Sequence, residues 1–200
     1  MKQKLLTALS EYKTYDSREA EHVKYALAYI EANDNCFDRT TKVSPVFDSE
    51  LRADITASAW LISPDRKSVL FTHHKKLSIW IPLGGHCDGE EDVLAVALKE
   101  AEEESGIQGI KPISEDIFDI DIQKIPAGSD GTPEHQHIDI RFILYAPHAD
   151  YIVSDESNDL RWISIGDVPL YNRDHAILRA CKKWTDLIQH DLALLPKPQI

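Results

Sequence analysis

The stretch GGHCDGEEDVLAVALKEAEEESGIQGI, residues 84–110, constrains the fold of this chain more than any other part of the sequence. After Asp92, which can cap a helix start, apolar residues recur at helical spacing until Gly106, a residue suited to a left-handed helix end. Gly84 and Gly85 precede the helix and allow a close approach of the backbone to a ligand. The stretch therefore predicts a glycine-rich loop that leads into an amphipathic helix.

Three glutamates crowd the last turn of this predicted helix. At 3.6 residues per turn, Glu100, Glu103 and Glu104 share an arc of about 100°, beside the apolar arc that must face a sheet. Like charges at these spacings destabilise a helix by roughly 0.2–0.5 kcal/mol per pair, and anions in the last turn oppose the helix dipole. A divalent cation would reverse the sign of both effects. We therefore interpret the carboxylates as metal ligands, and a solvated acidic face is the alternative.

The same stretch resembles the Nudix box, G-x5-E-x7-R-E-U-x-E-E-x-G-U, in which U is an aliphatic residue. The matching positions are Gly85, Glu91, Lys99, Glu100, Ala101, Glu103, Glu104, Gly106 and Ile107. Lys99 is the one clear departure, because the family usually has arginine there. The strand patterns before and after the box extend the resemblance over roughly residues 52–170.

The resemblance implies a hydrolase that cleaves a nucleoside diphosphate linked to another moiety, with Mg²⁺ or Mn²⁺ as cofactor, on an α/β/α sandwich with a mixed sheet. Carried over by position, the metal ligands are Glu100, Glu103, Glu104 and the backbone carbonyl of Gly85. Either Glu103 or Glu104 would deprotonate the attacking water, and we favour Glu104. Glu91 and Lys99 would brace the loop against the helix, although lysine lacks the planar two-point contact that arginine makes with a carboxylate.

The rest of the chain predicts strands in the middle and helices on both sides of them. Ser17 is a candidate cap for a helix that runs to about Asn33, and Asp174 for a C-terminal helix that runs to about His190. Alternating apolar residues predict strands at 54–62, 116–123, 135–146 and 160–165, with VLFTHH as a hairpin partner of the first. We expect an N-terminal helical extension over residues 1–51 and a Nudix hydrolase domain over residues 52–200 that includes the C-terminal helix.

A second polar pattern lies in EHQHIDIRF. In a strand, His135, His137, Asp139 and Arg141 project to one face. This face is either the solvated side of a half-exposed strand or the border of the cleft, where it would join His86. In the second case the histidines contact phosphate or base, and Arg141 donates to an anion. A transition-metal site built from the three histidines is a third alternative.

Three further side chains have two interpretations each. Trp60 and Trp80 either stack on a nucleobase or lie in the core, and the core is the more frequent place for a buried tryptophan. Glu156 is either an additional metal ligand recruited from outside the box or an exposed loop acid.

Two other functions are compatible with the resemblance. An isopentenyl-diphosphate-isomerase-like enzyme shares the fold and uses Cys, His and Glu near its metal, and His86 and Cys87 lie suggestively in the loop. A nucleotide-sensing module would keep the fold without the catalysis. The complete hydrolase box argues against the first function, and its retained carboxylates argue against the second.

Composition excludes several classes of protein. A formal net charge of −12 opposes a groove for a nucleic acid polymer, because such grooves need surplus lysine and arginine. No segment approaches the ~20 apolar residues of a membrane span, and the N-terminal apolar run is too short for a signal peptide. Cys36, Cys87 and Cys181 lack CxxC spacing, which fits free thiols in a reducing compartment. We expect a cytoplasmic protein with a small-molecule partner, whose extension either caps the active site or forms a homodimer.

Overall fold

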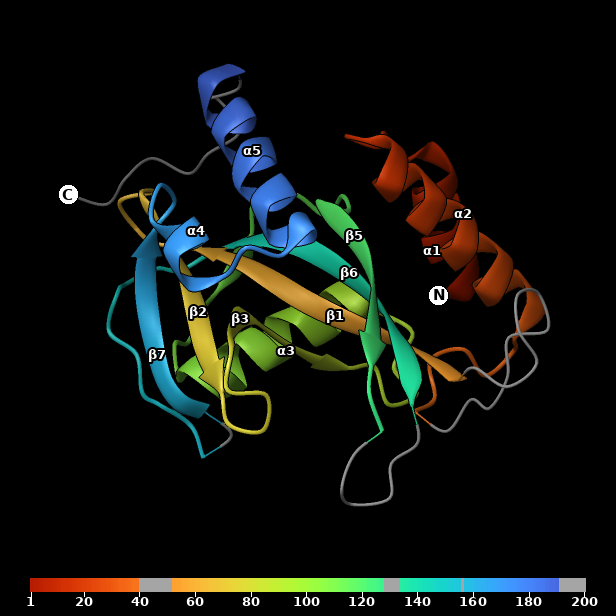
Figure 1. Cartoon of the computed structure of the whole chain (residues 1–200), viewed down its shortest axis with the longest axis horizontal. Coiled ribbons are helices and arrows are strands. Elements are labelled where there is room, and N and C mark those ends of the chain that lie inside the picture. Colours follow the sequence, from red (N-terminus) through yellow and green to blue (C-terminus); the bar gives the residue numbers. More distant parts are fainter. Residues whose placement is uncertain (40–51, 128–133, 156, 191–200) are drawn as a thin grey trace.

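The computed structural model describes residues 1–39, 52–127, 134–155 and 157–190. Among these residues a mixed sheet of seven strands carries helices on both faces (Figure 1). The strands are β1 (Arg52–Ile62), β2 (Ser68–His74), β3 (Trp80–His86), β4 (Lys111–Pro112), β5 (Asp119–Ile125), β6 (His135–Tyr145) and β7 (Ser157–Ser164). The helices are α1 (Lys2–Glu11), α2 (Ser17–Ala32), α3 (Val93–Ser105), α4 (Val168–Tyr171) and α5 (His175–His190). The predicted α/β fold with a mixed sheet is confirmed.

The centre of the sheet is a parallel pair. The strand order is β4-β6-β1-β3-β2-β7, and β5 pairs with β6 as well. β1 and β6 run parallel from Arg52↔His135 to Ile62↔Tyr145, whereas the other pairs are antiparallel. Because directly paired residues share a face, this long register aligns the polar residues of β1 with those of β6.

The predicted hairpin between β1 and β2 is wrong beyond its turn. A single residue pair, Ile62↔Val69, joins the two strands, and β3 then lies between them and pairs with both. β3 ends in residues that the sequence predicted as a loop, Gly84 to His86. Because glycine is depleted in strands, the local sequence pattern did not predict β3. The strand forms because β1 supplies its hydrogen-bond partners.

Two hydrophobic clusters lie on opposite faces of the sheet. β1 contributes Ile55, Ala57, Ala59 and Leu61 to the first cluster, which also includes the apolar side of α3. It contributes Trp60 and Ile62 to the second, which packs against α5. Figure 1 shows α5 on one face of the sheet and α3 on the other. The predicted division of β1 into two faces is confirmed.

The ends of α2 and α5 follow the local sequence. Asp16 caps α2, since its carboxylate accepts a hydrogen bond from the Glu19 amide at 2.8 Å, and the predicted cap Ser17 is the first residue of the helix instead. Asp174 caps α5 as predicted, accepting from the Ala176 amide at 2.9 Å. Both caps satisfy backbone donors that a helix start leaves unpaired.

The N-terminal helices pack on the sheet. Leu5, Leu9 and Val23 belong to the same hydrophobic cluster as β1, and the Tyr29 hydroxyl donates to the Ala53 carbonyl. The described part of the extension therefore shares a core with the strands that follow it. No helix within the described ranges is long and apolar enough to cross a bilayer. All three cysteines are buried free thiols, as predicted.

Candidate functional site

The three glutamates lie on α3, which packs against β1 and β3. The helix begins after Asp92, whose carboxylate accepts from the Ala95 amide at 3.2 Å, and ends at Gly106, with φ of 70°. Both predicted helix ends are confirmed. The apolar residues that α3 buries are Val93, Val96, Ala97 and Ala101. The predicted helix is thus present and is held by its apolar side against the sheet, whereas Gly84 and Gly85 of the predicted loop belong to β3.

The three carboxylates differ in burial. Glu104 is 8% exposed, and the side chain of Glu100 is 17% exposed, whereas that of Glu103 is 60% exposed. The predicted desolvation beside the apolar side is therefore found for two of the three. Lys99 Nζ lies 3.4 Å from Glu100 Oε1 and 3.3 Å from Glu103 Oε2, and its charge offsets part of their mutual repulsion.

Gly85 leaves room for a carboxylate against the backbone of β3. A Cβ at this position would lie 2.6 Å from Glu100 Cδ and 2.7 Å from Glu100 Oε2, which is closer than side-chain atoms approach one another. Carboxylate oxygens are the hard ligands that Mg²⁺ and Mn²⁺ prefer. The residues present fit the cation that the sequence predicted.

The resemblance implied that Glu91 and Lys99 brace the loop against the helix, and no ion pair joins the two residues directly in the described part of the chain. Glu91 Oε2 instead accepts a hydrogen bond from the Lys2 amide at 2.9 Å and lies 3.1 Å from the amino group of Met1. Lys99 lies about two helical turns further along, where it is attracted to the nearer carboxylates of the box. The contact within the box is thus replaced by a contact with the N-terminal extension.

The extension holds the loop between β3 and α3 at further points. The Gly89 amide donates to the Phe37 carbonyl at 2.9 Å. Arg39 donates from Nε and Nη2 to the two carboxylate oxygens of Asp88, each at 2.6 Å. Since Arg39 and Asp88 are 49 residues apart, local sequence patterns could not reveal this pairing. The position of the loop therefore depends on residues 1–39.

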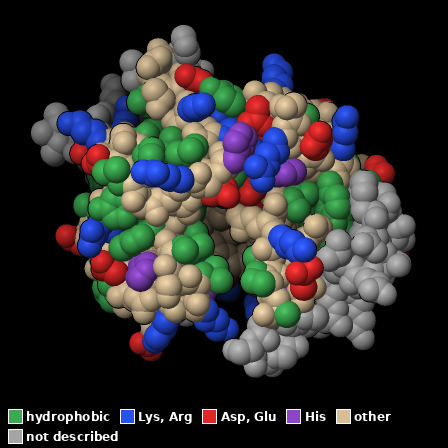
Figure 2. Space-filling view, in the orientation of Figure 1, with side chains coloured by type: hydrophobic (Ala, Val, Ile, Leu, Met, Phe, Trp, Pro, Cys, Tyr) green, Lys and Arg blue, Asp and Glu red, His purple; other side chains and the backbone are tan. Residues whose placement is uncertain are grey.

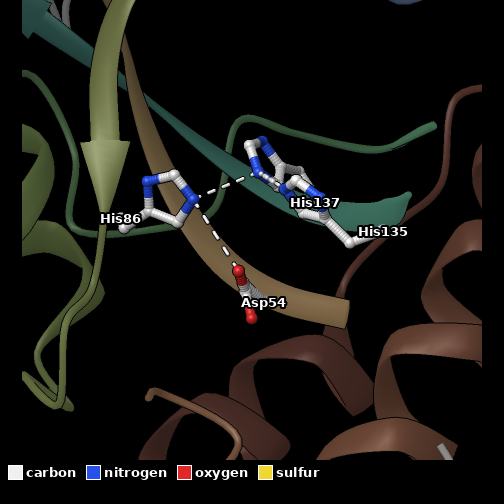
Figure 3. A group of neighbouring side chains, drawn as sticks. All are labelled: Asp54, His86, His135 and His137. Atoms are coloured by element: carbon white, nitrogen blue, oxygen red, sulfur yellow. Dashed lines mark hydrogen bonds and ion pairs between the residues drawn. The ribbon is translucent and has the colours of Figure 1, made fainter. Parts of the chain in front are cut away.

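A second cluster lies on the opposite side of β3 from the contact between Gly85 and Glu100. His86, one residue after Gly85, points the other way because side chains alternate along a strand. It meets His135 and His137 from the start of β6 and Asp54 from the start of β1 (Figure 3). The structure therefore brings together the three histidines that the sequence singled out.

Asp54 is the member of this cluster that sequence reasoning missed. It lies directly across from His137 in the parallel register of β1 and β6, and its Oδ2 is 3.8 Å from His86 Nε2. The one available signal was a polar residue at the start of an otherwise apolar strand. Without the register, that signal does not connect Asp54 to residues more than eighty positions away.

Burial keeps two imidazoles of this cluster, those of His86 and His137, neutral. Desolvation, with the charge of Arg39 as a further contribution, lowers the pKa of His86 to about 4. Desolvation and the neighbouring imidazoles lower the pKa of His137 to about 3. Both rings therefore carry no charge near pH 7, where their unperturbed pKa of about 6.5 would leave a minor protonated fraction.

Asp139 and Arg141 lie deeper on the same face. Arg141 is 1% exposed and donates to Asp139 at 2.8 Å, to Ser58 at 3.1 Å and to Asp119 at 3.4 Å. The expectation that Arg141 contacts a substrate anion is therefore corrected, because its guanidinium is enclosed and engaged with protein acceptors. This part of the strand is neither solvated nor a cleft border, since helices cover it.

The buried charges join the sheet to α5. Asp119, on β5, accepts from Arg179 Nε and Nη2 at 2.8 Å each and from Lys183 Nζ at 2.8 Å. Burial alone would raise the pKa of Asp119, but the hydrogen bonds from Arg179 and the charges of Arg141 and Lys183 lower it below its usual value. Asp119 and Ile120 lie on opposite sides of β5 as predicted, but the polar side is buried, and Phe118 packs in the second hydrophobic cluster instead of beside Ile120.

The two tryptophans differ in their surroundings. Trp60 is fully buried in the second hydrophobic cluster, which confirms the core interpretation. Trp80 is half-buried, and its ring stacks on His73 with centroids 5.1 Å apart, while the Arg161 guanidinium lies 5.3 Å from its centroid. Neither ring is left as a free platform for a base. Glu156 lies outside the described residues.

One face of the molecule is hollowed. Figure 2 shows the molecule hollowed near the centre of the face that is turned to the viewer. Hydrophobic side chains flank this hollow on both sides, and acidic side chains lie at its upper edge. Concave surfaces with mixed apolar and polar linings are where small molecules bind most often.

Comparisons with known proteins agree with this geometry. The family model described as NUDIX domain matches residues 53–184. No curated protein matches the chain in sequence. A MutT protein from Methanosarcina mazei Go1 is similar in structure, with a TM-score of 0.56 at 18% identity over 70% of this chain and 97% of that chain.

Two other solved structures show the same likeness. The C. elegans Ap4A hydrolase binary complex has a TM-score of 0.52 at 18% identity and covers 68% of this chain and 97% of that chain. A NUDIX-family hydrolase from Clostridium perfringens has a TM-score of 0.51 at 24% identity and covers 66% of this chain and 97% of that chain. At these identities the likeness establishes the fold.

Proposed function

This chain belongs to the Nudix family, and we propose that it is a Mg²⁺- or Mn²⁺-dependent hydrolase that cleaves the pyrophosphate linkage of a nucleoside diphosphate joined to another moiety. The observation that carries the proposal is the placement of Glu100 and Glu104, both shielded from solvent, with Glu100 against the backbone of Gly85. Like charges at the helical spacings of these glutamates repel one another, and a bound cation would offset that repulsion.

The roles of the box residues follow from their positions. A bound cation supplies polarisation of the phosphoryl oxygens and a water of lowered pKa. Glu100, Glu103, Glu104 and the Gly85 carbonyl would hold it. Glu100 packs against the β3 backbone, whereas Glu103 is largely exposed and pairs with Lys99. The helix thus offers one enclosed ligand and one exposed ligand.

We assign proton transfer to Glu104. It is the most buried of the three carboxylates, so bulk water is excluded from the side chain that receives the proton. As Glu104 takes the proton, the water oxygen forms a bond to phosphorus. The bridging P–O bond breaks, and its electron pair leaves with the departing phosphate.

The isomerase-like alternative requires a thiol next to the metal. Cys87 is 3% exposed and packs in the hydrophobic cluster that includes Cys36 and Val93, so it does not face the histidines. This packing supports the hydrolase over the isomerase. The free thiols also support our proposal of a reducing, cytoplasmic location.

A substrate panel tests the proposal. Nucleoside triphosphates, nucleotide sugars, ADP-ribose and dinucleotides are incubated with the protein and Mg²⁺ or Mn²⁺, and phosphate release is measured. We expect turnover of at least one class and its loss on chelation. Replacing the proton acceptor by Glu104→Gln should lower kcat by roughly 10²–10⁴-fold.

Glu102→Gln is the matched control, because Glu102 lies on the same turn but accepts hydrogen bonds from the Gly109 and Ile110 amides. It should retain turnover. Equal rates for Glu104→Gln and the unmodified protein would reject the assigned mechanism. Absence of phosphate release from every compound on the panel would favour the nucleotide-sensing module.

A further inference from the structure

Four side chains at one end of three neighbouring strands direct their ligating atoms toward a common point (Figure 3). They are Asp54 of β1, His86 of β3, and His135 and His137 of β6, and their ligating atoms all lie within 4.8 Å of one another. Strand pairing fixes this arrangement, because His137 lies opposite Asp54 and His86 lies opposite Thr56, two residues further along β1. The cluster is therefore built on regular strands rather than on loops.

The separations suit one small ion. His137 Nε2 lies 3.1 Å from His86 Nε2 and 3.0 Å from His135 Nε2, and Asp54 Oδ2 lies 3.8 Å from His86 Nε2. A tetrahedral zinc ion, with bonds of about 2.0–2.2 Å, holds its ligand atoms about 3.3–3.6 Å apart. These three distances lie on both sides of that range, and no two of the four ligating atoms are more than 4.8 Å apart. Shifts of up to about an ångström would therefore bring all four atoms to the separations of a tetrahedral site.

Hydrogen bonds between the imidazoles do not fully explain why three Nε2 atoms lie so close together. A neutral imidazole nitrogen carries either one proton or one lone pair. His137 Nε2 has two neighbouring nitrogens at bonding distance, in His86 and His135, so one proton or one lone pair must be shared between both. An ion between the rings would instead use the lone pair of each Nε2 atom fully.

The chemistry of the ligands selects the ion. We infer that Asp54, His86, His135 and His137 form a second metal site, which takes Zn²⁺ and is distinct from the glutamates of α3. Three imidazoles and a carboxylate suit Zn²⁺, whereas Mg²⁺ and Mn²⁺ prefer oxygen ligands throughout. The chain would therefore sort two classes of divalent ion into two sites on opposite sides of β3. This inference does not depend on the hydrolase proposal.

Four protein ligands make a closed site, which is the kind that stabilises structure. The ion would fasten the starts of β1 and β6 to the end of β3, where His86 directly follows Gly85. With their Nε2 atoms bound to such an ion, the histidines would not be available to phosphate or base. The proposal therefore favours the metal interpretation of the three histidines over the substrate-contact interpretation.

Metal titration without substrate tests the inference. The full chain is freed of metal by dialysis against a chelator and is then titrated with Zn²⁺, and separately with Co²⁺, which has an intense visible absorption when tetrahedral. We expect uptake of one ion per chain, the tetrahedral Co²⁺ spectrum, its displacement by Zn²⁺ but not by excess Mg²⁺, and a rise in Tm. A wild-type chain that binds no Zn²⁺, or gives only an octahedral Co²⁺ spectrum, would overturn the inference.

Variants locate the ion. His137→Ala should weaken Zn²⁺ binding by at least on the order of 100-fold and abolish the zinc-dependent rise in Tm, and His86→Gln provides a second, milder variant of the cluster. His148→Ala removes an exposed histidine and should bind as the wild type does. Glu100→Gln combined with Glu104→Gln should also leave zinc uptake unchanged. Uptake that survives both cluster variants, or disappears with the glutamates, would contradict the site.

Discussion

Gly84 and Gly85 are neighbours on β3 but face different surroundings. A Cβ on Gly84 would lie 2.4 Å from the Ala57 carbonyl oxygen, which belongs to the backbone of the adjacent strand and has no room to move. A Cβ on Gly85 would instead meet the end of the Glu100 side chain, which can rotate away. The first glycine therefore supports the sheet, and the second supports the position of a carboxylate.

The substitution Gly85→Ala tests the position of the Glu100 carboxylate separately from the stability of the sheet. We expect it to displace the Glu100 carboxylate and lower kcat on the order of 10²-fold, as misplacement by about 1 Å can do, while Tm changes little. Steady-state kinetics and thermal unfolding measure both quantities.

Two other glycines serve as references for this substitution. Gly84→Ala should lower the free energy of unfolding by about 1–3 kcal/mol through overpacking. Gly166→Ala should change nothing, since no atom lies within 4 Å of its Cβ. Full activity in Gly85→Ala would show that the placement of Glu100 against β3 is irrelevant to turnover.

At the scale of elements, buried charges fix α5 on β5. Asp119 is fully buried and receives hydrogen bonds from Arg179 and Lys183 of α5. Glu19 of α2 pairs with the same Lys183, so the network also reaches an N-terminal helix. Such a network positions elements, because each charge is costly to bury unless its partners are in place.

Asp119→Asn leaves the cations of this network without their shared carboxylate. We expect it to lower the free energy of unfolding by about 3–5 kcal/mol. Urea unfolding measures the change. The control is Asp159→Asn, which breaks a half-exposed pair with Arg161 and should cost less than about 1 kcal/mol. Equal effects of the two substitutions would contradict the role given to the buried network.

The stability difference between the unmodified chain and Asp119→Asn should depend on pH. The pKa of Asp119 is lower in the folded state than its usual 3.8, so its stabilisation is fully present above that value. As the pH falls below 3.8, the unfolded chain takes up a proton at this carboxylate while the folded state still holds it ionised, so the stabilisation is progressively lost. The difference in stability between the unmodified chain and Asp119→Asn should therefore shrink in acid below about pH 3.8. A difference that grows in this window would reverse the assigned sign.

At the scale of the whole molecule, the N-terminal helices and the sheet share one hydrophobic cluster. Leu9 of α1 is 1% exposed and belongs to the cluster that contains β1. The loop of the box is in turn held by the backbone of residues near the start of the chain. Folding of the extension and folding of the site are therefore expected to be one event.

Leu9→Ala tests this coupling. We expect the free energy of unfolding to fall by about 2–5 kcal/mol, the cost of a buried leucine cavity, in a single transition. Far-UV circular dichroism and tryptophan fluorescence should coincide, since Trp60 and Trp184 report the other face of the sheet. Leu170→Ala, at a residue that is 74% exposed, is the control and should change stability by less than about 0.5 kcal/mol. Two separated transitions would show that the extension unfolds independently.

The sequence by itself determined the features that local chemistry fixes. Helical spacing, the Asp92 cap and Gly106 defined α3, and alternation assigned each residue of β1 to a face, because these periods are properties of the backbone. The box spacing was sufficient to place Glu100 beside the apolar side of its helix. These residues needed no partner from elsewhere in the chain to be recognised.

Only the tertiary structure decided which elements become neighbours. β3 was hidden by its glycines until β1 supplied hydrogen-bond partners, Glu91 turned to Lys2, and Arg141 was enclosed by a network that includes α5. Asp54 joined the histidines through the register of β1 and β6. A period along the chain specifies the face of a side chain, whereas its partner on that face is set by strand pairing and packing across distances in sequence that no local pattern spans.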